Sequence, residues 1–328
     1  MKSIFKEKDG ITYEVDYRTE LLSIILILSD DYKKIVKNKM IPLNNKYIYD
    51  KVINLFGKFK EHNTIKLFNN LIKIHPYFNY DAPVTTILQL DENFKCNKLN
   101  DYIYEQILEK DNSIYEFINS LEQFSIDINF EDYYKNNEYL YNMYVDSMMS
   151  KHENILSYIN KFIDVKEKKL YVNAIPFNSY SNYSSFIDNN IYSNLGITQF
   201  SKKLNLYEDW ELNKYDMMLT TLHEYCHSFV NPLTSKYIDL KKYEYLKNDF
   251  IEEYGYDDVE TIINENVVRT ICLVYEYLYL DINKFDFDYT NEIKKFKYIE
   301  KIFDDILKYV QTDSNNFENI YKNILEKI

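Results

Sequence analysis

Apolar residues recur at helical spacing through the first half of the chain. Residues 18–39 carry apolar side chains on one helical face, at Leu21, Leu22, Ile25 and Leu28. This spacing is typical of an amphipathic helix packed on a core. Three further segments show the same spacing, at residues 47–75, 100–125 and 131–164. The pattern therefore predicts a mostly helical first half.

The pattern changes near residue 168. Residues 169–175 form a short β-prone run that ends at Pro176, as strands often do. A polar stretch follows, and a second β-prone segment covers residues 185–192 before Gly196. We expect these two segments to form a small antiparallel sheet, as a hairpin or a meander, because no other stretch has a convincing strand pattern.

Helical spacing returns after this region, in residues 206–230, 257–281 and 288–328. Asp257 is placed to cap the second of these helices, and Glu260 three residues later fits a capping box. We therefore expect a mostly α, α+β fold. We divide the chain into a helical N-terminal region, residues 1–165, and a region of residues 166–328 that holds the sheet and the C-terminal helices.

Composition and charge exclude several classes of protein. The chain has 39 Lys and Arg against 52 Asp and Glu, a net charge of −13. Neither a nucleic acid nor an anionic membrane surface is therefore an expected partner. The chain has only four glycines and no glycine-rich phosphate loop. Its three cysteines are an odd number and lie far apart, which does not fit a disulfide framework.

The first residues of the chain are charged, and the apolar centre of a signal peptide does not follow them. No apolar run approaches the length of about 20 residues that a membrane-spanning helix needs. We therefore expect a cytoplasmic protein, and export without a signal peptide stays open. The sequence does not indicate an oligomeric state.

The segment TTLHEYCHSFV carries candidate chemistry, because it contains the pattern H-E-x-x-H. On a helix, His223 and His227 lie one turn apart on the same face and can bind one Zn²⁺. Glu224 lies beside them and can act as general base on a metal-activated water. The neighbouring side chains are uncharged, as a buried helix requires, and we expect Asn231 and Pro232 to end the helix. The alternative is a helix whose two histidines pack or hydrogen-bond without a metal.

A catalytic zinc site takes three protein ligands and leaves one position for water. No histidine follows His227, so we expect a carboxylate from a later helix as the third ligand. The candidates are Glu252, Glu253, Glu260 and Glu265. Glu265 is favoured because it lies in an apolar helix, where a carboxylate is costly unless it is paired or bound to a cation. Arg269, one turn further on, can pair with it and help to orient the ligands. The alternative for Glu265 is an ordinary ion pair with Arg269 on a partly exposed helix.

A zinc peptidase also needs an extended strand that holds the substrate backbone and a donor for the oxyanion. The strands expected within residues 169–192 precede the H-E-x-x-H helix and could supply the strand. The candidate oxyanion donors are Arg269, Tyr254, Tyr256 and the tyrosines of residues 180–192. The sequence does not choose among them.

Three segments match a family pattern. Val15 to Ile25 reads VDYRTELLSII, residues 223–232 read HEYCHSFVNP, and Glu265 is followed by Val268 and Arg269. On these segments the chain resembles a bacterial family of zincin-like metallopeptidases with the opening V-D-x-R-x-E-L-L-S-I-I. The resemblance spans about residues 11–275 and implies a gluzincin-type fold, with the small sheet beside the H-E-x-x-H helix. It also implies His223, His227 and Glu265 as metal ligands and Glu224 as base.

We therefore expect a zinc-dependent hydrolase, most simply a metallopeptidase with Zn²⁺ as cofactor and a peptide or protein as substrate. Two alternatives stay open. One is a non-catalytic helical interaction protein with a structural or vestigial metal site, which would have no use for the base Glu224. The other is a metal hydrolase that acts on a different bond. The sequence indicates neither the cleavage preference nor endo- or exopeptidase action.

Overall fold

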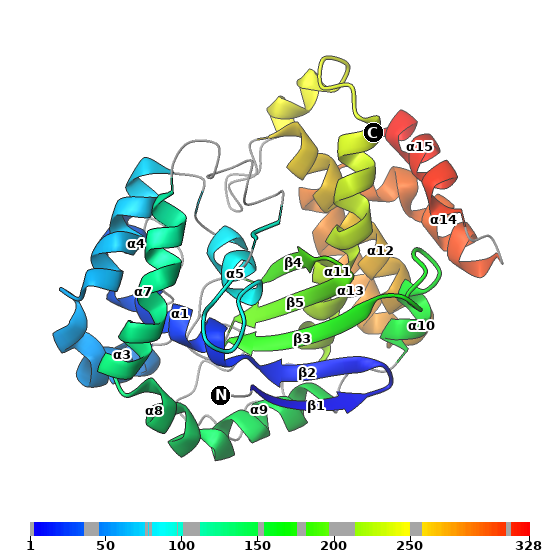
Figure 1. Ribbon diagram of the computed structural model, residues 1–328. Helices are drawn as coiled ribbons and strands as arrows, with labels where there is room; N and C mark the ends of the chain where they lie inside the picture. The colour runs from blue at the N-terminus through cyan, green and yellow to red at the C-terminus, as the bar shows by residue number, and fades with distance from the viewer. Residues whose placement is uncertain are drawn as a thin grey trace. The chain divides into compact units, whose positions relative to one another are not determined.

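A computed structural model gives the structure of the protein, which is mostly helical with one small sheet (Figure 1). The expected mostly α, α+β class is therefore confirmed. The structure describes residues 3–35, 46–75, 78, 81–96, 98–100, 112–149, 154–175, 182–196, 214–249, 258–312 and 316–328. Within these ranges, no helix is long and apolar enough to cross a membrane.

The chain divides into two compact units, which we describe separately. Unit 1 comprises Met1–His152 and Lys169–Thr221, and unit 2 comprises Glu153–Lys168 and Leu222–Ile328. The units differ from the sequence-based division into residues 1–165 and 166–328, because the strands after residue 168 pair with a strand near the N-terminus. The sheet therefore belongs with the N-terminal helices.

Five strands form the sheet of unit 1, in the order β1-β2-β3-β5-β4 (Figure 1). They are β1 (Ile4–Lys8), β2 (Ile11–Val15), β3 (Lys169–Ile175), β4 (Tyr183–Ile187) and β5 (Asn190–Gly196). β2 and β5 run parallel to β3, whereas β1 and β4 are antiparallel to their neighbours. The prediction of an antiparallel sheet is therefore wrong in this detail. The sheet is mixed, because β3 receives both of its partners through connections longer than a hairpin turn.

Tight turns join the antiparallel pairs. Asp9 and Gly10 connect β1 to β2 with φ values of 52° and 79°. A two-residue type I′ turn requires these left-handed values, and Asp-Gly adopts them readily. The hydrophobic pattern did not predict this hairpin. In place of the single strand expected at residues 185–192, the chain turns at Asp188, with φ of 54°, and forms β4 and β5 on either side.

Where the structure describes them, the predicted helical segments are largely helical, but most are broken into shorter helices. Unit 1 contains α1 (Tyr17–Leu28), α2 (Asp30–Ile35), α3 (Lys46–Phe56), the 3-10 helix η2 (Gly57–Phe59), α4 (Asn63–Ile74), α5 (Asp81–Leu88), α7 (Ser113–Asp127), α8 (Phe130–Asn136) and α9 (Glu138–Met149). Unit 2 contains α10 (Ile155–Ile159), the 3-10 helix η5 (Glu244–Asp249), α12 (Val259–Tyr279), α13 (Ile282–Lys295), α14 (Ile299–Gln311) and α15 (Phe317–Lys327). α11 (Lys214–Tyr237) contains the boundary between the two units.

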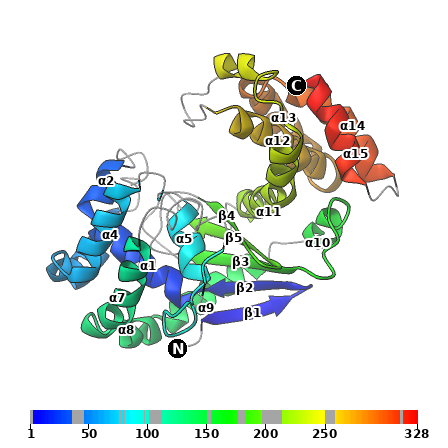
Figure 2. The ribbon, with the colours of Figure 1, turned by 45° about the horizontal axis from the view of Figure 1, so that its top comes forward.

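In unit 1, α9 lies along β1, β2 and β3, and α1 packs against α3, α5 and β3. α4 and α7 lie side by side (Figure 2). α1 is buried along nearly its whole length. It is therefore a core helix that is buried on nearly every side, and not only along the one apolar face that the spacing predicted.

Aromatic side chains hold the helices of unit 2 together. Phe162, which follows α10, stacks on Phe229 of α11 with ring centroids 5.2 Å apart. It also contacts the ring of Phe317 in α15 at 4.9 Å. Tyr158 of α10 donates a hydrogen bond of 2.7 Å to the carbonyl oxygen of Ile271 in α12. These contacts anchor α11 and α12, the two helices that carry the candidate site.

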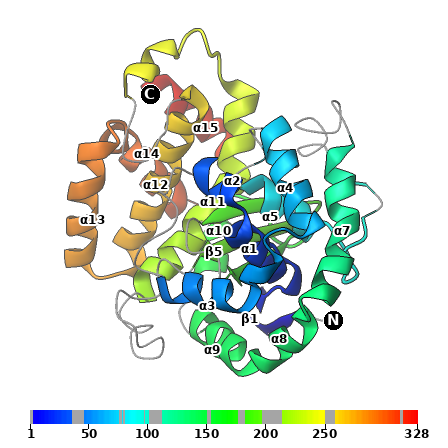
Figure 3. The same cartoon turned by 90° about the vertical axis from the view of Figure 1, so that its left-hand side faces the viewer.

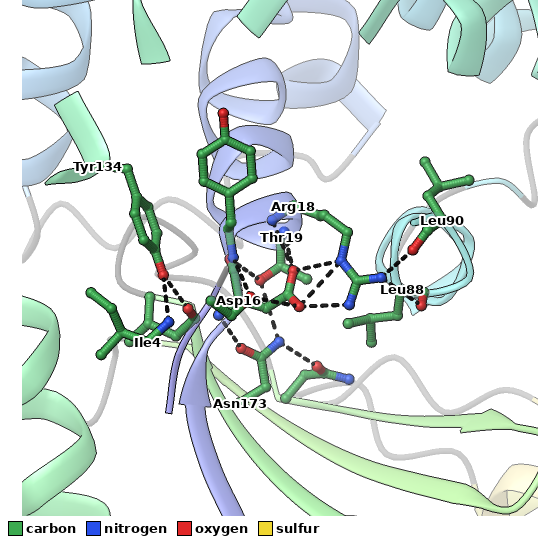
Figure 4. Close-up of polar contacts among 12 residues, drawn as sticks. Ile4, Asp16, Arg18, Thr19, Leu88, Leu90, Tyr134 and Asn173 are labelled. Carbon is green, nitrogen blue, oxygen red and sulfur yellow. Dashed lines mark hydrogen bonds and ion pairs between the residues drawn. The ribbon is translucent and has the colours of Figure 1, made fainter. Parts of the chain in front are cut away.

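A polar network joins the start of α1 to the end of α5 (Figure 4). Asp16 caps α1 by accepting hydrogen bonds from the backbone N–H groups of Arg18 (2.8 Å) and Thr19 (3.2 Å). It also pairs with the Arg18 guanidinium at 2.6 Å. The same guanidinium donates to the carbonyl oxygens of Leu88 (3.2 Å) and Leu90. The V-D-x-R opening of the chain therefore has a structural role in unit 1.

The sheet side of this network is polar and buried. Asn173 on β3 accepts a hydrogen bond from the N–H of Asp16 (3.1 Å) and donates one to Asn194 on β5 (3.0 Å). Glu14 pairs with Asn173 in the strand register and is 7% exposed. Burial and the charge of Asp16 raise the pKa of Glu14 to about 8, against the opposing charge of Arg18. The folded protein therefore favours a protonated Glu14 at neutral pH.

Asp16→Ala is expected to lower the free energy of unfolding by about 3 to 5 kcal/mol, because it removes the helix cap and leaves Arg18 without its counter-charge. Urea unfolding followed by circular dichroism measures the loss. The control is Lys6→Ala, which removes an ion pair with Asp146 between side chains 40% and 53% exposed. It is expected to cost at most about 1 kcal/mol. Similar losses in the two variants would contradict the structural role of Asp16.

Glu14→Gln is expected to change how stability depends on pH. The unfolded chain releases the Glu14 proton near the ordinary glutamate pKa, whereas the folded protein keeps it up to a pKa of about 8. The free energy of unfolding of the wild type therefore falls as pH rises through this window, by at most about 1.4 kcal/mol per pH unit. The variant lacks this loss. The free energy of unfolding of the variant minus that of the wild type should therefore increase between about pH 5 and about pH 8. An equal stability difference at both pH values, measured by urea unfolding, speaks against a raised pKa of Glu14.

Candidate metal centre

α11 and α12 supply the residues of the candidate site, all of them in unit 2. His223 and His227 lie one turn apart on α11, as the H-E-x-x-H spacing predicts. α11 does not end at Pro232 but continues to Tyr237. The N-cap of α12 is Asp258, whose carboxylate accepts from the Thr261 N–H at 2.8 Å. Asp257, the cap expected from the sequence, lies outside the described residues. Most of α12 is buried, as its apolar sequence predicts.

The structure brings the two histidines and Glu265 to one point. The Nε2 atoms of His223 and His227 are 3.1 Å apart. The Glu265 carboxylate lies 3.7 Å from the first through Oε2 and 3.5 Å from the second through Oε1. Tetrahedral ligands about 2.0–2.1 Å from a zinc ion are separated from one another by roughly 3.3 to 3.4 Å. The spacing of the three donors therefore fits a zinc-sized cation with few adjustments.

This cluster stands out in the part of the chain that the structure describes. There it is the one group of three or more His, Cys, Asp and Glu donors close enough to share an ion. The side chains of His223 and His227 are 19% and 15% exposed, and that of Glu265 is 6% exposed. The imidazoles therefore keep some access to solvent, while the carboxylate is buried beneath them.

Each of the three donors has a further polar partner. Nδ1 of His227 lies 3.0 Å from Oδ1 of Asn231, one turn further along α11. An amide oxygen only accepts hydrogen bonds, so Nδ1 carries the proton and Nε2 keeps a lone pair. The thiol of Cys272 is hydrogen-bonded to His223. Nε of Arg269 donates to Oε2 of Glu265 at 3.0 Å. Such outer contacts commonly orient metal ligands.

The charges of the cluster are strongly coupled. Burial alone lowers the pKa of His223, but the charge of Glu265 and hydrogen bonds with Cys272 and Glu265 raise it to about 10. Burial and the charge of His223 lower the pKa of His227 to about 4. Burial alone raises the pKa of Glu265, but the charge and hydrogen bond of His223 hold it well below its usual range. The cluster thus accommodates one positive charge next to the carboxylate, and a metal cation would take the place of that proton.

Glu224 follows His223 on α11 and is 7% exposed. Its negative charge contributes to the raised pKa of His223. Glu224 is therefore a second buried carboxylate beside the cluster. It is separate from Glu265 and is not part of the donor set.

The other candidates from the sequence have different positions. Glu260 accepts a hydrogen bond from Ser235 at 3.1 Å and is not part of the cluster. Five candidates lie outside the described residues: Tyr180, Glu252, Glu253, Tyr254 and Tyr256. Within residues 180–192, Tyr183 and Tyr192 are buried in the sheet of unit 1.

The strand expected to bind substrate lies in the segment that forms β3, β4 and β5 of the sheet. β4 is at the edge of the sheet and has no second neighbour among the described strands. The side chain of Asn100 donates a hydrogen bond of 3.2 Å to the carbonyl oxygen of Phe186 in β4. Part of this edge is therefore engaged within unit 1, and the use of β4 for substrate binding stays a prediction.

Sequence reasoning missed three partners of the site. Asn231 could have been found, because it lies four residues after His227 on the same helix. Cys272 lies seven residues after Glu265 and so on the same face of α12, but its proximity to His223 depends on helix packing. Glu292 of α13, which contacts Arg269 at 3.1 Å, has no sequence signal that connects it to the site.

The fold and the three donors define a class: an α+β protein with a candidate metal site on two packed helices. The chain belongs to the family described as Domain of unknown function (DUF4932), which it matches over residues 11–326. The match includes parts of both units. No curated protein and no solved structure matches the chain.

The protein loaded with zinc and then dialysed is expected to retain about one zinc ion per chain. Glu265→Ala is expected to abolish this retention, because two imidazoles alone leave the ion without its carboxylate ligand. Elemental analysis measures the zinc. The matched control is Glu260→Ala, which removes another carboxylate of α12 that lies outside the cluster. Full retention by Glu265→Ala, or equal loss in the two variants, would rule out this donor set.

Proposed function

We propose that the protein is a zinc-dependent hydrolase and, more specifically, a metallopeptidase. One observation carries the proposal. The Nε2 atoms of His223 and His227, on the H-E-x-x-H helix, lie 3.1 Å apart and 3.7 and 3.5 Å from the two carboxylate oxygens of Glu265, which is close to the spacing of zinc ligands. Imidazole and carboxylate together suit Zn²⁺. A fourth position would stay open for water, as in catalytic zinc sites.

Each residue has a role in this proposal. His223 and His227 bind as neutral imidazoles through Nε2, and Asn231 holds His227 in the tautomer that this requires. With Zn²⁺ bound, the site gains a Lewis acid and a water activated near neutral pH. Glu224 takes the proton from the attacking water and passes it to the leaving amine. Its burial next to the cluster suits a proton acceptor.

The peptide bond is favoured by the resemblance to zincin-like metallopeptidases at His223 to Pro232 and at Glu265. The residues of the oxyanion site stay open. Arg269 is already engaged by two carboxylates, those of Glu265 and Glu292. We therefore assign it to orientation of the metal ligand and not to the oxyanion.

Two other functions remain as alternatives. In a helical interaction protein, the metal would be structural, but a structural zinc site fills all four positions with protein ligands and has no need of a base. The three donors together with Glu224 favour the enzyme. A hydrolase that acts on another bond shares the same donor set, and the choice between the two substrates depends on activity measurements.

Glu224→Gln is expected to retain zinc and to lower peptide hydrolysis by a factor of about 100 or more, because the amide cannot accept the water proton. A peptide library read by mass spectrometry detects turnover, and elemental analysis checks the metal. Glu260→Gln, a similar change outside the cluster, serves as the control and should hydrolyse peptides at the wild-type rate. Wild-type turnover by Glu224→Gln, or turnover that survives complete removal of the metal, would overturn the mechanism.

A further inference from the structure

Arg269 of α12 connects the metal centre to the neighbouring helix α13. Its Nε donates to Oε2 of Glu265 at 3.0 Å, and its Nη1 donates to Oε2 of Glu292 at 3.1 Å. α12 and α13 pack against each other (Figure 3). One guanidinium is therefore shared between a metal-ligand candidate and a carboxylate of α13.

The position of this guanidinium is closely restricted. It lies over the ring of Phe296, 4.3 Å from the ring centroid, and Phe296 is 1% exposed. The Arg269 side chain is 18% exposed and that of Glu292 is 23% exposed. The chain after α13 is also fixed, because the N–H of Tyr298 donates to Oδ1 of Asn266 on α12 at 3.1 Å. An arginine held by a ring on one side and a carboxylate on each end has little freedom to turn.

This arrangement has a consequence for Glu265. Arg269 donates to Oε2, which also lies 3.7 Å from Nε2 of His223, while Oε1 lies 3.5 Å from Nε2 of His227. We propose that Glu292 is a positioning residue of the zinc site, an inference that rests on the proposed function. Through Arg269, it would fix the orientation of the Glu265 carboxylate beside the two imidazoles that would hold the metal with it.

The charges around the site support the same role. A divalent cation and Arg269 bring three positive charges, and Glu224, Glu265 and Glu292 bring three negative charges, while the imidazoles are neutral when they bind metal. Without Glu292, Glu265 would be the remaining carboxylate of this pair of contacts, and Arg269 would bind it more strongly. That stronger pair would compete with the metal for the carboxylate.

A general role in helix packing is the competing explanation. α12 and α13 are joined by a second polar contact, the hydrogen bond between Glu276 and Asp288. Burial and this neighbour raise the pKa of Glu276 to about 9, so that a protonated Glu276 can donate to Asp288. Asp288 lies one turn before Glu292 on α13, pairs with Lys284 at 2.6 Å, and is not one of the donors of the cluster. Asp288→Asn therefore changes α12–α13 packing without changing the shared guanidinium.

The test compares zinc affinities in a double-mutant cycle. Glu292→Gln is expected to raise the zinc dissociation constant about tenfold, the size of effect seen for outer partners of metal ligands. In the Arg269→Ala background the same substitution should change the constant less than about twofold, because Glu292 acts through Arg269. Asp288→Asn should bind zinc with nearly wild-type affinity. Competition with a chromophoric chelator measures all four constants.

A second measurement reports on the ligand itself. The visible absorption of the cobalt-substituted protein depends on how many donors surround the ion. Glu292→Gln should change it, because Arg269 then pairs more strongly with Glu265 and draws its carboxylate away from the ion, whereas Asp288→Asn should leave it unchanged. Identical cobalt spectra for wild type and Glu292→Gln overturn the positioning role, as does wild-type zinc affinity in Glu292→Gln. Equal weakening by Asp288→Asn assigns the effect to packing and also overturns it.

These outcomes separate this inference from the proposed function. A wild-type protein that binds no zinc refutes both the zinc site and the role of Glu292, before any variant is examined. A protein that binds zinc but hydrolyses no peptide refutes the peptidase alone, and the affinity cycle still decides the role of Glu292.

Discussion

The burial of one carboxylate, that of Glu265, is the constraint on which the rest of unit 2 depends. It is 4% exposed on a helix that is otherwise largely apolar, where an uncompensated carboxylate would cost several kcal/mol. Compensation comes from α11 through two imidazoles and from α12 itself through Arg269. If α11 moved relative to α12, Glu265 would lose the contacts with the imidazoles and its buried charge would be less well compensated. The same contact that stabilises the helix pair also collects the metal donors.

The two units use the same device in different settings. In unit 1, Asp16 is buried and paired with Arg18, two residues away. Asp16 also caps α1, and Arg18 also donates to a carbonyl oxygen at the end of α5. In unit 2, Glu265 is paired with Arg269 but still faces two imidazole nitrogens. The first arrangement is closed by its own contacts. The second leaves donor atoms close to a common point, and for this reason it is the candidate metal site.

The sequence predicted the local part of the site and not the part that depends on packing. His223 and His227 share a helix face because four residues make about one turn, whatever the helix packs against. Glu265 could be chosen because burying a carboxylate needs a reason. Glu292 and Cys272 could not be chosen, because their positions depend on how α13 and α11 lie against α12.

The fold shows the same limit. The helices were predictable from spacing, but α11 continues beyond Pro232. There Thr234 is hydrogen-bonded to Asn264 of α12 and to Tyr321 of α15, contacts that the sequence does not indicate. The Asp9–Gly10 turn was a local signal of a hairpin, and it was overlooked because β1 is mostly exposed and polar. The parallel pairing of β2 with β3 had no local signal, because it joins segments far apart in the chain.

The parallel pairing of β2 with β3 affects how the protein folds during synthesis. Ile11 lies opposite Leu170, so during synthesis the edge of the β1–β2 hairpin stays unpaired while the long segment between Val15 and Lys169 emerges from the ribosome. Contacts of such long range are slow to form, and unpaired edges are prone to join other chains. The stretch that must be made in the meantime, α1 to α10, includes α9, which lies along β1 and β2. α9 is therefore in a position to shelter the nascent hairpin until its parallel partner arrives.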